Sequence, residues 1–133
     1  MEALDIQGLD PAVRFLSGGF HSGDFGFTVP LYASVAAKAT KFARFSLRDF
    51  SASGVTVFDA GLNAFSGGFC DSTSGFFLPG GIGGRHVLRF ELADPIMMQV
   101  LEYGDGNSSL PQFFGGFSDG AFGYSVPWGG STS

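Results

Sequence analysis

The sequence predicts an all-β protein built from tandem repeats, and three observations support this prediction. The 133 residues include 22 Gly and 17 Phe, whereas Gly usually makes up about 7% of a protein. A segment of fourteen residues occurs three times, at offsets of 49 and 48 residues. Within each copy, apolar residues alternate with small or polar ones, which is typical of a strand with one buried face. Frequent Gly with frequent aromatic residues favours short strands and tight turns over helices.

The three copies align without gaps over 17–30, 66–79 and 114–127. Five columns are identical, namely a glycine pair, a Phe, a later Gly and a Pro. We expect the glycine pair to permit close backbone approach or an unusual φ, and the Pro to end a strand because it cannot donate to the ladder. The residues given this structural role are Gly18, Gly19, Phe20, Gly26, Pro30, Gly67, Gly68, Phe69, Gly75, Pro79, Gly115, Gly116, Phe117, Gly123 and Pro127.

Two further pieces recur outside this segment. Residues 43–49 (ARFSLRD) match 88–94 (LRFELAD), and residues 57–59 (VFD) match 100–102 (VLE), with 3–5 (ALD) as a weaker first copy. We expect each piece to be a strand, which gives four strands in a unit of about 48 residues. The whole of 1–133 then reads as one repeat region. Its units are approximately 14–63, 64–111 and a partial 112–133, and 1–13 is expected to be the tail of a preceding unit.

Four strands in a unit of this length are typical of a β-propeller blade. A sheet that is apolar on both faces is stable only when neighbouring sheets cover it. The predicted fold is therefore a set of antiparallel four-stranded blades of an incomplete β-propeller, with about 2.75 repeats. Propellers typically have 4–8 blades, so three alternatives stay open. The chain is part of a longer protein, or copies of it close a ring, or the sheets form an open or non-propeller stack.

The order of these pieces resembles a known repeat type. A glycine pair, a turn, an aromatic strand and an RF-x-L strand are similar to the kelch-type repeats of β-propellers. The string SGGF, GΦxVP (Φ aromatic) and RFxL also resembles tandem-repeat proteins of unknown function. The resemblance implies a propeller repeat and implies no particular activity.

Composition and charge exclude several classes of function. The net charge is −5 and the seven Lys and Arg residues do not cluster, so the basic surface that nucleic acids require is missing. No stretch approaches the ~20 apolar residues of a membrane-spanning helix. The first ten residues do not look like a signal peptide, so we expect a soluble protein and leave the compartment open. Cys70, the single cysteine, cannot form an internal disulfide and is expected to be a small buried hydrophobe.

The sequence contains no recognisable catalytic or metal-binding motif, and we predict no metal site and no cofactor. His21 and His86 do not occupy matching positions in the repeat. The turn residues Asp71 and Asp119 are weak candidates for binding a cation or a sugar hydroxyl, and ordinary turn chemistry explains them equally well. We expect residues 80–84 to form a flexible loop, 105–109 an Asx-type turn, and 33–41 a longer connection between strands.

These observations favour a non-enzymatic repeat segment that serves as a binding or interaction scaffold, with a protein or a glycan as partner. Two alternatives stay open: a carbohydrate-binding propeller, and a fragment of a propeller-fold hydrolase. We also expect self-association, because an isolated segment would leave sheet faces and edges uncovered.

Overall fold

A computed structural model describes residues 1–31, 39–80, 84–102 and 113–127. The predicted loops and connections at 33–38, 81–83 and 105–109 lie outside the described residues. The prediction of an all-β fold with antiparallel sheets is confirmed. In chain order the elements are α1 (Ile6–Leu9), β1 (Leu16–Ser22), β2 (Phe25–Pro30), β3 (Lys41–Ser46), the 3-10 turn η1 (Ala52–Gly54), β4 (Val55–Asp59), β5 (Phe65–Cys70), β6 (Ser74–Pro79), β7 (His86–Glu91), β8 (Met98–Glu102), β9 (Phe113–Ser118) and β10 (Gly123–Pro127).

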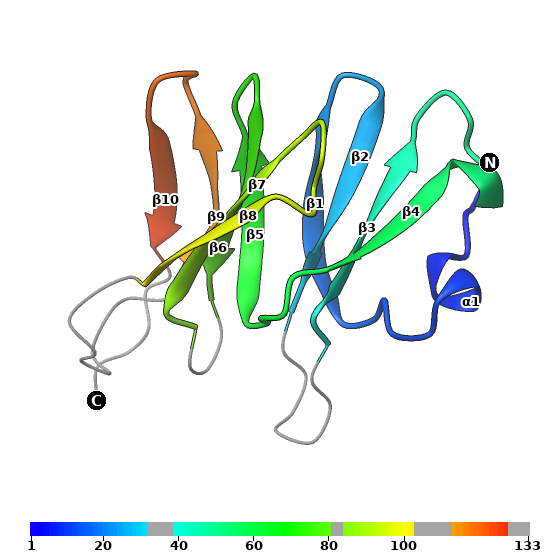
Figure 1. The fold of residues 1–133 in the computed structure, drawn as a ribbon, viewed down its shortest axis with the longest axis horizontal. Helices are drawn as coiled ribbons and strands as arrows, with labels where there is room; N and C mark the ends of the chain where they lie inside the picture. The colour runs from blue at the N-terminus through cyan, green and yellow to red at the C-terminus, as the bar shows by residue number, and fades with distance from the viewer. Residues whose placement is uncertain (32–38, 81–83, 103–112, 128–133) are drawn as a thin grey trace.

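The strands form three antiparallel sheets, of four, four and two strands (Figure 1). The first is β1-β2-β3-β4, the second is β5-β6-β7-β8 and the third is the hairpin β9-β10. Each strand pairs with the next one in sequence, so each sheet is a simple meander. The four repeated pieces of sequence therefore form four equivalent strands in each of the first two sheets. The described part of the third sheet contains only the equivalents of the first two of these strands.

The prediction of a strand at 3–5 is wrong, because the chain there leads into helix α1. The carboxylate of Asp5 caps that helix, since its Oδ1 accepts the Gly8 amide at 2.8 Å. A local bond from an Asp side chain to the backbone competes with strand pairing. The segment is held on the first sheet further along, where Asp10 forms a 2.9 Å salt bridge with Lys41 of β3 and Val13 is buried. No helix in the described part of the chain has the length and apolar character needed to cross a bilayer.

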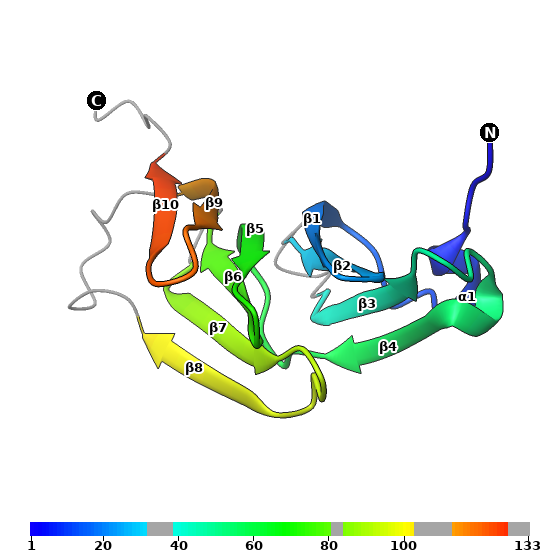
Figure 2. The same ribbon diagram turned by 90° about the horizontal axis from the view of Figure 1, so that it is seen from above.

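The three sheets lie side by side with their first strands adjacent (Figure 2). Strand β1 lies next to β5, and β5 lies next to β9, whereas β4 and β8 lie far from this line of first strands. An apolar core fills the space between the first and second sheets. It consists of buried aromatic and aliphatic side chains: Phe27, Val29, Phe42, Ala60, Phe65, Phe77, Leu88 and Phe90.

The glycine pairs lie where the first strands approach one another. The first glycine of each pair has a positive φ, +116° at Gly18, +155° at Gly67 and +141° at Gly115. The pairing register of each hairpin is irregular beside its glycine pair. A Cβ atom built on Gly67 would lie 2.7 Å from the Cα atom of Gly115. The backbones of β5 and β9 are therefore closer than any residue other than glycine allows at this point.

A repeated hydrogen bond ties each sheet to the next. Ser17 Oγ donates to the Phe65 carbonyl at 3.0 Å, and Ser66 Oγ donates to the Phe113 carbonyl. In the third copy Phe114 stands at the matching position. In the described part of the chain, the two contacts between sheets therefore share their glycine positions and a hydrogen bond from a serine hydroxyl to a backbone carbonyl.

Candidate binding site

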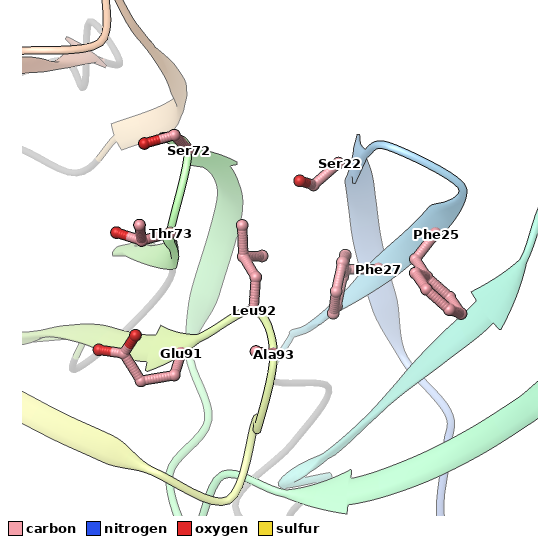
Figure 3. A pocket seen from close by; sticks show the side chains of 8 residues that line it. All are labelled: Ser22, Phe25, Phe27, Ser72, Thr73, Glu91, Leu92 and Ala93. Atoms are coloured by element: carbon pink, nitrogen blue, oxygen red, sulfur yellow. The ribbon is translucent and has the colours of Figure 1, made fainter.

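A pocket of about 400 Å³ opens between the first and second sheets, beside the turns that join their first two strands. Figure 3 shows residues of the first sheet facing residues of the second across this gap. The lining residues are Ser22, Phe25, Phe27, Ser72, Thr73, Glu91, Leu92 and Ala93. They come from two different repeat units, so the pocket exists only when the sheets are stacked.

The pocket has an apolar floor and a few polar groups at its rim. Phe27 is 2% exposed and belongs to the core, whereas Phe25 is 40% exposed and offers part of its ring to solvent. The guanidinium of Arg44 lies 4.8 Å from the centre of the Phe25 ring, a cation–π contact that holds this ring in place. The Ser22 hydroxyl points into the gap in Figure 3.

Glu91 at the end of β7 lines the pocket, but Figure 3 shows its carboxylate directed away from the first sheet. The Arg89 guanidinium lies 3.6 Å from this carboxylate, and both side chains are about half exposed. An aromatic ring and a hydroxyl beside an apolar floor are groups that orient a small polar ligand.

A second pocket occupies the matching place between the second sheet and the β9-β10 hairpin. It has a volume of about 120 Å³ and is lined by Phe69, Asp71, Phe76, Ser118, Gly120, Ala121, Phe122 and Gly123. In the repeat alignment Asp71 corresponds to Ser22, Phe76 to Phe27, and Ala121 to Thr73. The same cleft therefore recurs at both contacts between sheets.

The two predicted candidate residues, Asp71 and Asp119, are turn residues in the structure. Oδ1 of Asp71 accepts the amides of Thr73 and Ser74 at 2.8 and 2.7 Å. Oδ1 of Asp119 likewise accepts the two amides that follow its turn, at 2.9 and 2.8 Å. Both are Asx-type turns, whose geometry explains why Asp recurs there. Asp71 also lines the second pocket, while the described pockets do not include Asp119.

Asp71 and Asp119 stand in separate turns, and no group of three His, Cys, Asp or Glu side chains in the described part of the chain is arranged to hold a metal ion. Among the described residues, the fold therefore gives no further support to the hypothesis that Asp71 or Asp119 binds a cation.

Backbone amides lower the pKa of both turn carboxyls from the ordinary value of 3.8. At Asp71 the Thr73 amide is the largest cause, followed by the Ser74 amide. At Asp119 the Phe122 amide comes first and the Ala121 amide second, and the Tyr124 hydroxyl, 2.9 Å from Oδ2, adds to them. Folding therefore favours the ionised form of each carboxyl.

We expect the free energy of unfolding to fall as the solution is acidified. Since the folded pKa values of Asp71 and Asp119 are lowered, their contribution to stability is complete above the unfolded pKa of about 4. It is lost as the pH falls through the lower, folded values. Urea unfolding between about pH 7 and about pH 2 measures this decline. The double variant Asp71→Asn, Asp119→Asn keeps an acceptor in each turn but cannot titrate. It should show a smaller decline than the wild type, and equal declines would contradict the assignment.

Sequence reasoning missed Ser22 and Phe25, which carry the chemistry of the larger pocket. The feature that could have indicated them is their position, because each lies at a strand end beside a turn within a repeated piece of sequence. Cys70, expected to be buried, is only partly buried, and its Sγ donates to the His21 carbonyl at 3.3 Å. This bond links β5 to β1, and burial raises the pKa of the Cys70 thiol.

Comparison of the chain with models of known protein families, with curated proteins and with solved structures found no match. The two recurring pockets are therefore the features from which a function is inferred.

Proposed function

We propose that the chain is a β-propeller repeat segment that acts as a non-enzymatic binding scaffold, with its ligand at the hairpin turns. Four-stranded antiparallel meanders that lie side by side, with their first strands adjacent, are the arrangement expected of neighbouring blades (Figure 2). Repeat proteins commonly bind partners along a surface composed of equivalent positions in successive units.

The observation that carries this proposal is the recurrence of the pocket. Both sheet-to-sheet contacts open a cleft beside the same turns, lined at matching positions. The residues at those positions vary, for example Ser22 against Asp71 and Thr73 against Ala121. A constant cleft with a variable lining suits a protein segment or a glycan that is contacted at several points along its length.

A glycan is the second candidate, and the lining of the larger pocket favours it. The partly exposed Phe25 ring can stack on the apolar face of a sugar, while the Ser22 hydroxyl can bond a sugar hydroxyl. The hydrolase alternative has less support. Glycoside hydrolysis normally uses two carboxylates across the scissile bond, and among the described lining residues Glu91 is the only acid in this pocket.

Filling the larger pocket tests the proposal. The probes are a glycan array and a displayed library of unstructured peptides, each screened with the wild-type chain. The Ser22 side chain lines the pocket and points into the gap, so Ser22→Trp should fill the pocket, keep the circular dichroism of the wild type and weaken binding of the selected probe about tenfold or more. The matched control is Ala52→Trp, at an exposed position of η1 outside the pocket. Undiminished binding by Ser22→Trp, or no binding to either probe by the wild type, would refute the proposal.

A further inference from the structure

The two contacts between sheets are built in the same way, with an aromatic ring placed on a glycine. Phe20 of the first sheet lies against Gly68 of the second, so a Cβ atom there would be 3.0 Å from the ring. Phe69 of the second sheet lies against Gly116 of the hairpin, with the corresponding distance 3.2 Å. We call the aromatic residue the knob and the glycine the socket. A Cβ atom at either glycine would also lie within 2.4 Å of a carbonyl oxygen of its own sheet, that of Phe76 at Gly68 and that of Tyr124 at Gly116, so neither position accepts a side chain.

Each knob is supported by an aromatic partner on the neighbouring strand. Phe20 stacks on Phe27 and Phe69 stacks on Phe76, with ring centroids 5.4 and 5.1 Å apart. The third copy repeats this support, because Phe117 stacks on Tyr124 at 5.1 Å. The knob of the β9-β10 hairpin is therefore already formed.

This third knob is not covered by the described part of the chain. Phe117 is 57% exposed and Tyr124 43% exposed, whereas Phe27, at the Tyr124 position of the first copy, is 2% exposed. Other large apolar side chains of the hairpin are also exposed: Phe114, Phe122 and Val126. One end of the stack thus presents an apolar face with a knob.

The other end of the stack presents the matching socket. A Cβ atom built on Gly19 would have atoms of its own sheet, in Phe27 and Thr28, as its nearest neighbours. Around it lies an open pocket of about 370 Å³ lined by Gly18, Gly19, Phe20, His21, Gly26, Phe27, Thr28, Phe45 and Leu47. The socket of the first sheet is therefore already formed, and no aromatic ring is among the atoms nearest to a Cβ atom at Gly19.

The residues around this socket match those of the covered socket in the second sheet. Phe45 packs over Gly26 as Phe90 packs over Gly75, and Leu47 corresponds to Leu92. Phe90 is 1% exposed and Leu92 packs against the core, but Leu47 is 47% exposed. The same kind of surface is thus buried at one position of the chain and open at the other.

The open area spans two strands, as the hairpin does. The N-terminal segment packs near β3, where Asp10 meets Lys41 and Val13 is buried. The open pocket is lined mainly by β1 and β2. The described part of the third sheet has only the two strands that would lie against such a half-sheet (Figure 2).

We propose that a second copy of this chain docks head to tail, with the β9-β10 hairpin of one copy on the β1-β2 face of the other. Phe117 of one copy then occupies the socket at Gly19 of the next, in the contact that the chain already makes twice internally. The two surfaces differ, so the interface is heterologous and each copy can bind one neighbour on either side. Repetition gives a closed ring if the rotation between copies permits it and a filament if it does not. This inference does not depend on the proposed function of the pockets.

The test uses three single variants of the full chain, followed by sedimentation velocity and light scattering. Phe117→Asp removes the knob, and Leu47→Asp places a charge beside the socket. Ile96→Asp is the control, at a 70% exposed position between β7 and β8. Substituting Gly19 itself is unsuitable, because a Cβ atom would lie 2.4 Å from the Phe27 carbonyl oxygen within the same sheet.

We expect the wild type and Ile96→Asp to associate as protein concentration rises. Association should strengthen with salt, because each copy carries a net charge of −5. Phe117→Asp and Leu47→Asp should each weaken association about 30-fold or more, as expected for an interface hot spot. An equimolar mixture of these two variants should form a dimer and nothing larger, because each variant retains one intact surface.

Three results would overturn the proposal. The first is a wild type that stays monomeric at its highest soluble concentration. The second is a Leu47→Asp variant that associates like the wild type, which indicates hairpin-to-hairpin contact instead. The third is a mixture of the two variants that stays monomeric. Circular dichroism of each variant shows that loss of association is not loss of fold.

Discussion

Replacing Phe90 with alanine is expected to lower the free energy of unfolding by about 3–5 kcal/mol. Phe90 is 1% exposed and lies at the centre of the core between the first two sheets. Its ring centroid lies 5.1–6.3 Å from those of Phe20, Phe27, Phe42 and Phe77. The variant loses the transfer free energy of the ring and leaves a cavity that rigid sheets cannot close. Chemical denaturation followed by circular dichroism measures the change.

Two further substitutions make this result interpretable. Small domains are stable by only about 5–15 kcal/mol, so Phe90→Ala can leave little folded protein to titrate. Phe90→Leu retains much of the volume and should cost about 1–2 kcal/mol. Ile96→Ala, at a 70% exposed position, should change stability by less than about 0.5 kcal/mol. Equal effects of Phe90→Ala and Ile96→Ala would mean that the two sheets do not pack through this cluster.

Substituting Gly67 with alanine is expected to have a similarly large effect, about 3–4 kcal/mol, because two costs add at this position. The backbone has φ of +155°, which L residues rarely adopt. The new Cβ atom would also lie 2.7 Å from the Cα atom of Gly115. The atoms that would clash with the new Cβ atom are all backbone atoms of β9. Because no side-chain rotation can relieve the clash, β5 and β9 must separate.

Gly115→Ala is the matched control for the backbone strain alone. Its φ is +141°, yet a Cβ atom there would have nothing within 4 Å. It should cost about 1–2 kcal/mol, and Gly18→Ala, with φ of +116° and equally open surroundings, should behave in the same way. Urea titrations of the three variants separate the close approach from the strain. If Gly67→Ala were no worse than Gly115→Ala, the first strands would not be in contact as described.

Much of the fold could be predicted because the relevant signals are local. The alternation over 88–92 predicts a strand, and β7 (His86–Glu91) covers all of these residues except Leu92. The Asp at the turns predicts Asx geometry, and both Asp71 and Asp119 accept two backbone amides. The failed prediction at 3–5 came from a match of three residues, which is too short to outweigh a local cap. The Asp5 side chain supplied that cap and favoured a helical turn.

The candidate site was less predictable than the strands because its walls come from different units. Ser22 and Glu91 are separated by nearly seventy residues in sequence, and no local pattern indicates that they line one pocket. Their meeting depends on the face-to-face stacking of two sheets. The same applies to Cys70 and the His21 carbonyl, whose bond joins neighbouring sheets.

The sequence by itself determined the strands, their order and the spacing of the units, since hydrophobic alternation, glycine and turn chemistry act over a few residues. Only the tertiary structure decided which of the equivalent faces are buried. Phe27 and Val29 are at most 2% exposed, whereas Tyr124 and Val126, at the same positions of the third copy, are 43% and 47% exposed. An identical local pattern gives opposite burial because burial depends on the sheet that lies alongside, and the hairpin has no such sheet within the described chain.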